Sequence, residues 1–491
     1  MTKIGLKISG GLLLRLSIAS GIMFVACGQD DSVESQNLAS TPTELQMITS
    51  NASGIQNNAF EFRGMFDGVK SFFGTDIAAK HNTILDTIAD GFQNRTVGDF
   101  ISQNEFDQFS KLINTNEGGL TNKNGNAIGT ARPYDTLSSL TVLELLKTYI
   151  GFSSIDKAFR TTGANRYSIT FPGKVETFFQ RRLTTNTSVE RWINNIYTHW
   201  DTVKEAAEKD WKREGKTNTD ANETMADSLF SLFVFDIAQI KLLREKSIIS
   251  NANDIRNRFY KGALGDGKKK AKTLASIYKT ADIVCVQETS QALVDEMTKR
   301  TGFLSLGSSD FVLASSFKPG GSAIFLRKSI FSNTQKLPLI NSQLDAAEVV
   351  LVTATASNQK YLIASAHSDS KGKNSSDILQ EIDTQTVKNR IIVGHDANTK
   401  KADNVSTYLE KAQQLGLAPA FDTDSKEPVT SFKTRTFVQT QITKAEKEDT
   451  KRSDYILTKG LQVGTNDMIK KPGPSDDNPS DHAILQIAFS K

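Results

Sequence analysis

The sequence of 491 residues predicts two kinds of architecture in series, a mainly α-helical region followed by an α/β domain with two packed sheets. Between residues 59 and 225, apolar residues recur three and four positions apart, which is typical of helices with one buried face. From residue 230 onward, short β-branched and aromatic runs alternate with helical stretches. The hydrophobic fraction of 38% and charged fraction of 23% are those of a soluble globular protein and exclude collagen-like, disordered and multi-span membrane classes.

Residues 1–26 have the pattern of an export signal. Basic residues precede and interrupt an apolar run that is too short and too rich in Gly and Ser for a membrane span. The run ends in Phe24-Val25-Ala26-Cys27, which resembles the lipobox of bacterial lipoproteins, in which the cysteine is acylated and becomes the mature N-terminus. An ordinary signal peptide with a chance cysteine is the alternative. We expect an exported protein anchored through Cys27 to the outer membrane or the cell surface.

The residues after the signal predict a tether and then helices. Residues 27–58 are polar and rich in Ser, Asn, Gln and Thr, which favours a flexible tether. Residues 59–225 are predicted to form a mainly helical domain whose role and protein partner the sequence does not reveal. Its apolar stripes include Ile84, Leu85 and Ile88; Phe106, Phe109, Leu112 and Ile113; Leu137 to Tyr149; and Trp192 to Trp200. The polar stretch 212–225 indicates a linker.

Residues 230–491 are predicted to form one α/β domain. Its helices are expected at 271–280 and 376–388. Its strands are expected at 232–237, 283–286, 323–326, 349–353, 361–366, 390–393, 455–457 and 483–487.

Polar residues stand at the ends or starts of several of these predicted strands. Glu288 follows one apolar run and His367 another, whereas Asp396 and Asn398 follow a third. Asp454 stands directly before a strand, and the pair Asp481-His482 stands before the last one. Each of these motifs alone is weak. Three of the five histidines of the chain nevertheless lie beside acids at strand boundaries of this one domain, which favours a functional cleft.

In order and spacing, these residues resemble the endonuclease/exonuclease/phosphatase superfamily, which includes deoxyribonuclease I-like nucleases and neutral sphingomyelinases. The resemblance covers about residues 232–491 and implies a four-layer α/β sandwich that hydrolyses phosphoester bonds with Mg²⁺. It implies that Glu288 binds metal, with Asp481 near the metal. It further implies that His367 and Asn398 contact the phosphate, that Asp396 forms an Asp-x-Asn pair with Asn398, and that Asp454 orients the acid/base residue His482.

The sequence departs from the family pattern at two places. The family usually opens with a strand ending in Asn, and here the aligned position in 232–237 is Asp236, a further candidate metal ligand. His395 stands directly before Asp396, as a spare phosphate contact or as a packing residue. Both changes leave the residue types that the mechanism needs in place, so we expect an active enzyme.

The chemistry of phosphodiester hydrolysis explains these residue types. Mg²⁺ prefers carboxylate, phosphate and water oxygens, so Glu288, Asp481 and Asp236 form a suitable set, with Mn²⁺ or Ca²⁺ as further candidates. His482 is a candidate base, because imidazole titrates near neutrality; Asp396 is the alternative. Asn398 and His367 would donate hydrogen bonds to the phosphate oxygens.

Charge favours nucleic acid as the substrate. The net charge of +4 hides an asymmetry, because residues 27–230 carry 20 basic and 26 acidic residues and residues 231–491 carry 36 basic and 29 acidic ones. Basic clusters, including Arg452 beside Asp454, could contact the phosphate backbone. We therefore expect a non-specific nuclease. A sphingomyelinase-type phospholipase C and a non-catalytic binding or adhesion lipoprotein are the alternatives.

Overall fold

The structure of the protein is a computed structural model that describes a large part of the chain. The described residues are 44–53, 59–60, 62–114, 132–147, 201–202, 204–206, 209, 225–261, 267–299, 310–338, 347–369, 372–385, 390–399, 402–421, 428–437, 440–441 and 447–490. The signal segment, Cys27, the stripe from Trp192 to Trp200 and most of the linker predicted at 212–225 lie outside these residues. No helix within the described ranges is long and apolar enough to cross a membrane.

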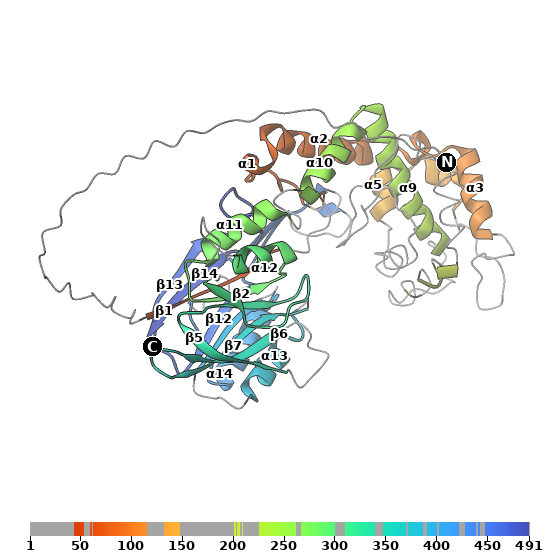
Figure 1. Cartoon of the computed structure of the whole chain (residues 1–491). Helices are drawn as coiled ribbons and strands as arrows, with labels where there is room; N and C mark the ends of the chain where they lie inside the picture. The colour runs from red at the N-terminus through yellow and green to blue at the C-terminus, as the bar shows by residue number, and fades with distance from the viewer. Residues whose placement is uncertain are drawn as a thin grey trace, which may run out of the picture. The chain divides into compact units, whose positions relative to one another are not determined.

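Two six-stranded mixed sheets form the centre of the α/β domain (Figure 1). The first has the order β13-β14-β1-β2-β4-β3 and the second the order β5-β6-β7-β8-β12-β9. The strands of the first sheet are β1 (Glu44–Asn51), β2 (Ile283–Gln287), β3 (Phe311–Leu313), β4 (Ala323–Arg327), β13 (Val463–Lys470) and β14 (Ile484–Ser490). Those of the second are β5 (Phe331–Leu337), β6 (Ala347–Ala354), β7 (Lys360–His367), β8 (Ile391–Asp396), β9 (Ala418–Pro419) and β12 (Asp454–Lys459). A separate two-stranded ribbon consists of β10 (Ser431–Thr434) and β11 (Glu448–Lys451).

Helices cover the outer face of each sheet, so the domain has four layers. Alternating residues of both sheets form a common buried core that includes Cys285, Ile363 and Ile456. On the outer face of the first sheet pack α11 (Lys268–Tyr278) and α12 (Gln291–Thr298). On that of the second pack α13 (Ser375–Asp383) and α14 (Ala402–Gln414). The expected α/β sandwich is confirmed, because period-two strands bury one face between the sheets and the other under helices.

A separate hydrophobic core holds the helical region together. It contains α1 (Lys70–Phe73), α2 (Thr75–Asn94), α3 (Gln103–Asn114), α4 (Tyr134–Ser138), α5 (Val142–Lys147), α9 (Met225–Glu245) and α10 (Ile249–Lys261). The helices predicted from the stripes at 84–88 and 106–113 are confirmed as α2 and α3, whereas the stripe from Leu137 is divided between α4 and α5.

Two expectations about the domain boundaries are wrong. The tether expected over 27–58 contains β1, a largely buried strand that pairs antiparallel with β14 and parallel with β2. The strand expected at 232–237 is the middle of α9, a helix buried almost all round. The helical region is therefore inserted between the first two strands of the sandwich and extends to residue 261.

Candidate active site

Six strand boundaries bring the polar residues to one edge of the sandwich. The parallel pairs β1–β2 and β7–β8 end side by side, which brings together Asn51 with Gln287 and His367 with Asp396. Strand β12 runs antiparallel to β8, so its first residue, Asp454, stands opposite Asp396. Strand β14 is antiparallel to β1, and so the residues before β14 reach the same edge.

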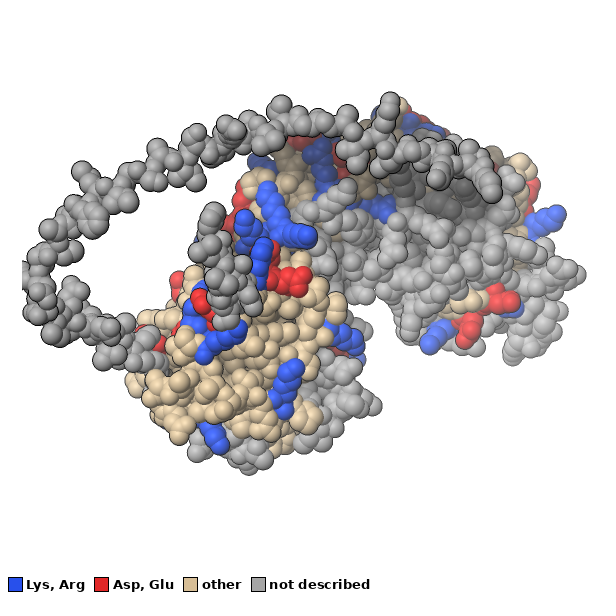
Figure 2. Space-filling model, viewed as in Figure 1, with Lys and Arg blue, Asp and Glu red and all other residues tan. Residues whose placement is uncertain are grey.

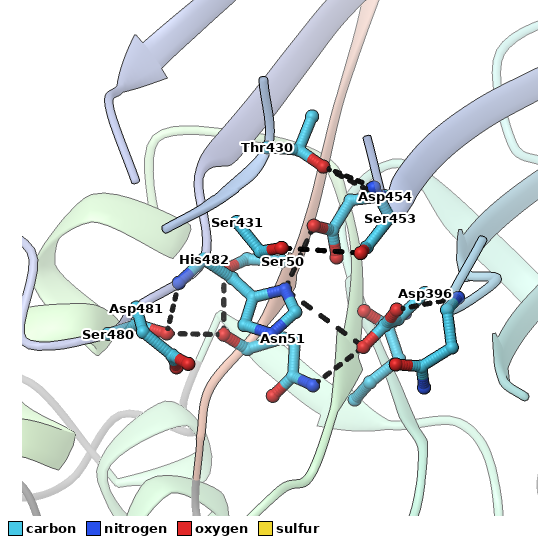
Figure 3. A network of polar contacts seen from close by, with 12 residues as sticks. Ser50, Asn51, Asp396, Thr430, Ser431, Ser453, Asp454, Ser480, Asp481 and His482 are labelled. Carbon is cyan, nitrogen blue, oxygen red and sulfur yellow. Dashed lines mark hydrogen bonds and ion pairs between the residues drawn. The ribbon is translucent and has the colours of Figure 1, made fainter. Parts of the chain in front are cut away.

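A buried histidine–aspartate pair lies at the centre of this edge (Figure 3). The Nδ1 atom of His482 is 2.9 Å from Oδ2 of Asp454, and the two side chains are 8% and 1% exposed. Thr430 Oγ1 accepts hydrogen bonds from the backbone N–H of Ser453 and of Asp454, which fixes the start of β12. Nε2 of His482 makes no hydrogen bond within the described part of the chain. The pair thus orients the imidazole and leaves its second nitrogen for chemistry.

Asp396 connects the other strand ends. Its Oδ2 accepts a hydrogen bond from Asn51 Nδ2 at 2.8 Å and lies 3.6 Å from His367 Nε2 and 4.0 Å from His482 Nδ1. Its Oδ1 accepts from the backbone N–H of Asn398, whose own amide donates to the carbonyl of Ser368. Burial opposes ionisation of Asp396, but the nearby imidazoles and the Asn51 amide outweigh it and lower the pKa of the carboxyl.

Glu288 lies at the same edge, directly after β2. Its backbone is left-handed, with φ of 49°, and its Oε1 is 3.8 Å from Nε2 of His367. A non-glycine residue in this region is strained, which is common at functional sites. His367 therefore lies between Glu288 and Asp396 and is within 4 Å of both carboxylates.

Asp481 is held by contacts from three directions. Its Oδ1 accepts a hydrogen bond from Ser53 Oγ, its Oδ2 is 2.9 Å from Lys433 Nζ, and its carbonyl accepts from the backbone of Phe432. Burial would raise the pKa of Asp481, but Lys433, His482 and Ser53 together hold it below its usual range.

The carboxylates also determine the electrostatics of His482. Burial alone would lower the pKa of its imidazole, but Asp454, Asp481 and Asp396 outweigh this effect and raise it to about 10. Burial is the main cause that raises the pKa of Asp454, against the opposing effect of His482. The carboxylates around His482 therefore favour the protonated, positively charged form of its imidazole.

Three predicted site residues lie elsewhere. Asp236 is buried in α9 within the helical core, so its assignment to the metal site is wrong. His395 is fully buried, with Nδ1 2.8 Å from Tyr408 Oη and Nε2 2.8 Å from Ser368 Oγ, and it is therefore a packing residue and not a phosphate contact. Arg452 is 4% exposed and stacks its guanidinium over the ring of Tyr455, which argues against direct contact with substrate.

Sequence reasoning missed Asn51 and Ser53. It grouped Lys433 with Arg435 as a basic cluster for the phosphate backbone, whereas the structure pairs Lys433 with Asp481. Asn51 is the strand-ending asparagine for which Asp236 was mistaken. The signal was present, because Leu45, Met47 and Ile48 form a short apolar run that ends in Asn51. It was overlooked because the run lies in a polar stretch more than two hundred residues before the next strand of its sheet.

The donor atoms at this edge fit a hard divalent cation. Asp396, Asp454 and His482 each offer an atom within 4.8 Å of the others, and Glu288 and Asp481 add further carboxylates. Among the described residues, Asp454 Oδ1 is buried and has no hydrogen-bond partner. An oxygen-rich set of this kind suits Mg²⁺, Mn²⁺ or Ca²⁺ better than softer metals.

One family model and several solved structures are similar to parts of this chain. A sequence model of the Endonuclease/Exonuclease/phosphatase family matches residues 258–482. No curated protein matches the chain. Similar solved structures include D. rerio TDP2 in complex with a single-strand DNA product, at 17% identity over 45% of this chain and 92% of that chain, with a TM-score of 0.34. The human Nocturnin catalytic domain matches at 21% identity over 45% and 85%, with a TM-score of 0.33. A Bacteroides vulgatus protein of the same family matches at 14% identity over 45% and 90%, with a TM-score of 0.34.

Proposed function

We propose that this chain, whose residues 258–482 form an Endonuclease/Exonuclease/phosphatase family domain, is a divalent-metal-dependent phosphodiester hydrolase that cleaves nucleic acid without sequence preference. The observation that carries the proposal is the buried pair of His482 and Asp454 beside Asp396, with Glu288 and His367 at the same edge. Buried titratable groups that converge at the ends of strands are typical of catalytic sites.

The proposed roles follow from the contacts. Glu288 and Asp481 would hold the metal, with Asn51 supporting the site in the place first given to Asp236. The metal, when bound, would polarise the phosphoryl group and neutralise charge on the leaving oxygen. Asp454 would hold His482 in one orientation, so that Nε2 can exchange a proton with water or the leaving group. His367 and Asn398 would donate hydrogen bonds to the phosphate oxygens. Asp396 remains the alternative to His482 as the base.

Charge supports nucleic acid as the substrate. The exposed lysines Lys268, Lys269 and Lys272 lie on α11, and Figure 2 shows basic side chains gathered over this part of the sandwich. Lysines of this kind bind phosphate backbones without reading sequence.

The test is to incubate the full chain with supercoiled plasmid, single-stranded RNA and sphingomyelin vesicles, each with Mg²⁺ or with EDTA. We expect Mg²⁺-dependent cleavage of the nucleic acids that is lost in His482→Ala. Release of choline phosphate instead would identify a phospholipase C. Inactivity on all three and on mononucleotides would leave a non-catalytic binding lipoprotein and overturn the proposal.

We further propose that the protein is exported and lipid-anchored at Cys27, on the strength of the signal-like residues 1–26. Cells grown with labelled palmitate should incorporate label into the wild-type chain and not into Cys27→Ala. Equal labelling of both would contradict the anchor.

A further inference from the structure

The segment that leaves β1 contacts the ribbon beside the catalytic residues. Phe62 forms an antiparallel bridge with Arg435, and the backbone N–H of Arg63 donates to the carbonyl of Thr434 at 2.9 Å. The start of the helical region is thus joined to the end of β10. Phe62 and Arg63 lie outside the family match, which covers residues 258–482, whereas their partners Thr434 and Arg435 lie within it.

The same ribbon holds the catalytic pair from its other side. Ser431 forms a bridge with His482, and the backbone N–H of Phe432 donates to the carbonyl of Asp481. Thr430 fixes the start of β12 at Asp454. A displacement of β10 would therefore move Asp454, Asp481 and His482 together.

Lys433 connects Phe62 to Asp481. Its ammonium lies 4.9 Å from the centre of the Phe62 ring and 2.9 Å from Oδ2 of Asp481. Phe62 is 6% exposed, the Lys433 side chain 24% and the Asp481 side chain 5%. Inside a protein, a buried carboxylate needs a partner cation, and a cation over an aromatic face is attracted by the ring. The ring of Phe62 therefore fixes the cation that neutralises Asp481.

We propose that Phe62 is a positioning residue that acts on Asp481 through Lys433, so that the inserted helical region completes the active site of the sandwich. The kinetic test of this inference rests on the proposed function. The stability test rests only on the contacts among Phe62, Lys433 and Asp481. Through this contact, the insertion is a required part of the catalytic unit.

The kinetic test compares variants of Phe62 in the full chain, with bis(4-nitrophenyl) phosphate and Mg²⁺ as the probe. Phe62→Leu keeps the apolar bulk and removes the aromatic face. It should lower kcat about 3- to 30-fold, the range of a partly desolvated cation–aromatic contact, and leave KM within about twofold. Phe62→Trp should restore the wild-type rate, because indole attracts cations more strongly.

Phe72→Leu is the matched control. Phe72 lies in α1, and its ring centre is 4.3 Å from Nζ of Lys269, so the substitution removes the same kind of contact from the same region away from Asp481. It should leave kcat unchanged. Equal losses in Phe62→Leu and Phe72→Leu, or no rescue by Phe62→Trp, would overturn the proposal.

A second arm needs no activity. In urea unfolding, the loss of midpoint caused by Phe62→Leu should be smaller when Lys433 is already Met, because only the packing part of the loss then remains. The coupling between Phe62→Leu and Asp481→Asn should disappear in the same background. Additive losses in all pairs would contradict transmission through Lys433. If the wild-type chain hydrolyses nothing, the proposed function fails, and this cycle still decides whether Lys433 connects Phe62 with Asp481.

Discussion

At the scale of single residues, the hydrogen bond between His482 and Asp454 sets the orientation and the charge of the imidazole in the candidate site. Asp454 is 2% exposed, and its Oδ2 is hydrogen-bonded to Nδ1 of the His482 imidazole. Its Oδ1 has no hydrogen-bond partner among the described residues. An amide in its place would keep the shape and remove the negative charge that favours the imidazolium. The carboxylate matters here for its charge more than for its packing.

Asp454→Asn should lower kcat by about a hundredfold to ten-thousandfold, the usual contribution of an acid–base group, and should leave the folded structure intact. Turnover on plasmid and far-UV circular dichroism measure the two effects. Asp467→Asn, at an exposed position of β13, is the matched control and should be silent. Wild-type turnover of Asp454→Asn would remove Asp454 from the mechanism.

The sequence predicted most residues of the candidate site, because each of them belongs to a short motif next to a predicted strand. Glu288, His367, Asp396, Asn398, Asp454, Asp481 and His482 each adjoin a strand boundary, and the structure brings these residues to one edge. Arg452 was misread, and His395 was left open between a phosphate contact and a packing residue, because a basic residue beside an acid has the same local pattern whether it faces solvent or the core. Only the alternation of β8 places His395 on the opposite face from Asp396.

Strand β8 contains a glycine, Gly394, at a point where the two sheets come close together. A Cβ on Gly394 would collide with the side chain of Thr49 and would lie 2.6 Å from Cβ of Cys285. The two sheets therefore lie in close contact at Gly394, two residues before Asp396, where no larger side chain fits.

Gly394→Ala should destabilise the fold by about 1–3 kcal/mol, because overpacking forces shifts in both sheets. Urea unfolding measures the loss. Gly464→Ala in β13 is the control, since its nearest neighbour at 3.1 Å is the end of the Glu44 side chain, which can move aside. Equal stability of the two variants would refute the close approach.

Helix α2 buries a histidine that makes the helical region sensitive to acid. His81 stacks on Phe60, and its Nε2 lies 2.9 Å from the carbonyl of Ala59. Burial lowers the pKa of His81 to about 4, against smaller opposing effects of Asn82 and Ala59. The unfolded chain, with an ordinary pKa near 6.5, then binds a proton that the folded chain excludes.

Stability from this group is complete above about pH 6.5 and is lost as the pH falls toward about 4, by up to about 3 kcal/mol. Urea unfolding across this range should show a shallower pH dependence in His81→Phe than in the wild type. The carboxyl groups are the same in both proteins, so the difference between the two pH curves is the contribution of His81. Parallel curves would mean that His81 titrates normally.

Strand β1 shows why an element can be missed by pattern and still be essential. Its residues lie in a polar stretch, and only its pairing with β2 and β14 makes it a central strand. In contrast, α9 was misread because four of its consecutive residues, 232–235, are apolar, which suits a buried strand and a buried helix equally. Length distinguishes the two, since α9 has 21 residues.

At the scale of the whole molecule, the sandwich and the helical region belong to one compact unit from Thr43 to Lys491. The family match from residue 258 would suggest a shorter catalytic fragment. Such a fragment lacks β1, and without it β2 and β14 would each lose a neighbour and expose unpaired edges.

A fragment of residues 230–491 should therefore aggregate or unfold without a cooperative transition, whereas residues 43–491 should unfold cooperatively. Size-exclusion chromatography and thermal circular dichroism compare the two. A monomeric, cooperatively folded 230–491 fragment would show that β1 is dispensable.

The pairing of β1 with β14 also has a consequence for the order of events during synthesis. Glu44 pairs with Ser490, so almost the whole sequence lies between these two partners. Closing so long a loop is entropically costly, and chains dominated by distant contacts fold slowly. Strand β1 leaves the ribosome early, can pair with β2 once residues 283–287 have emerged, and lacks its second partner until residues 484–490 have emerged. The edge of the sandwich that holds Asp454 and His482 is therefore complete only after residues 484–490 have been synthesised.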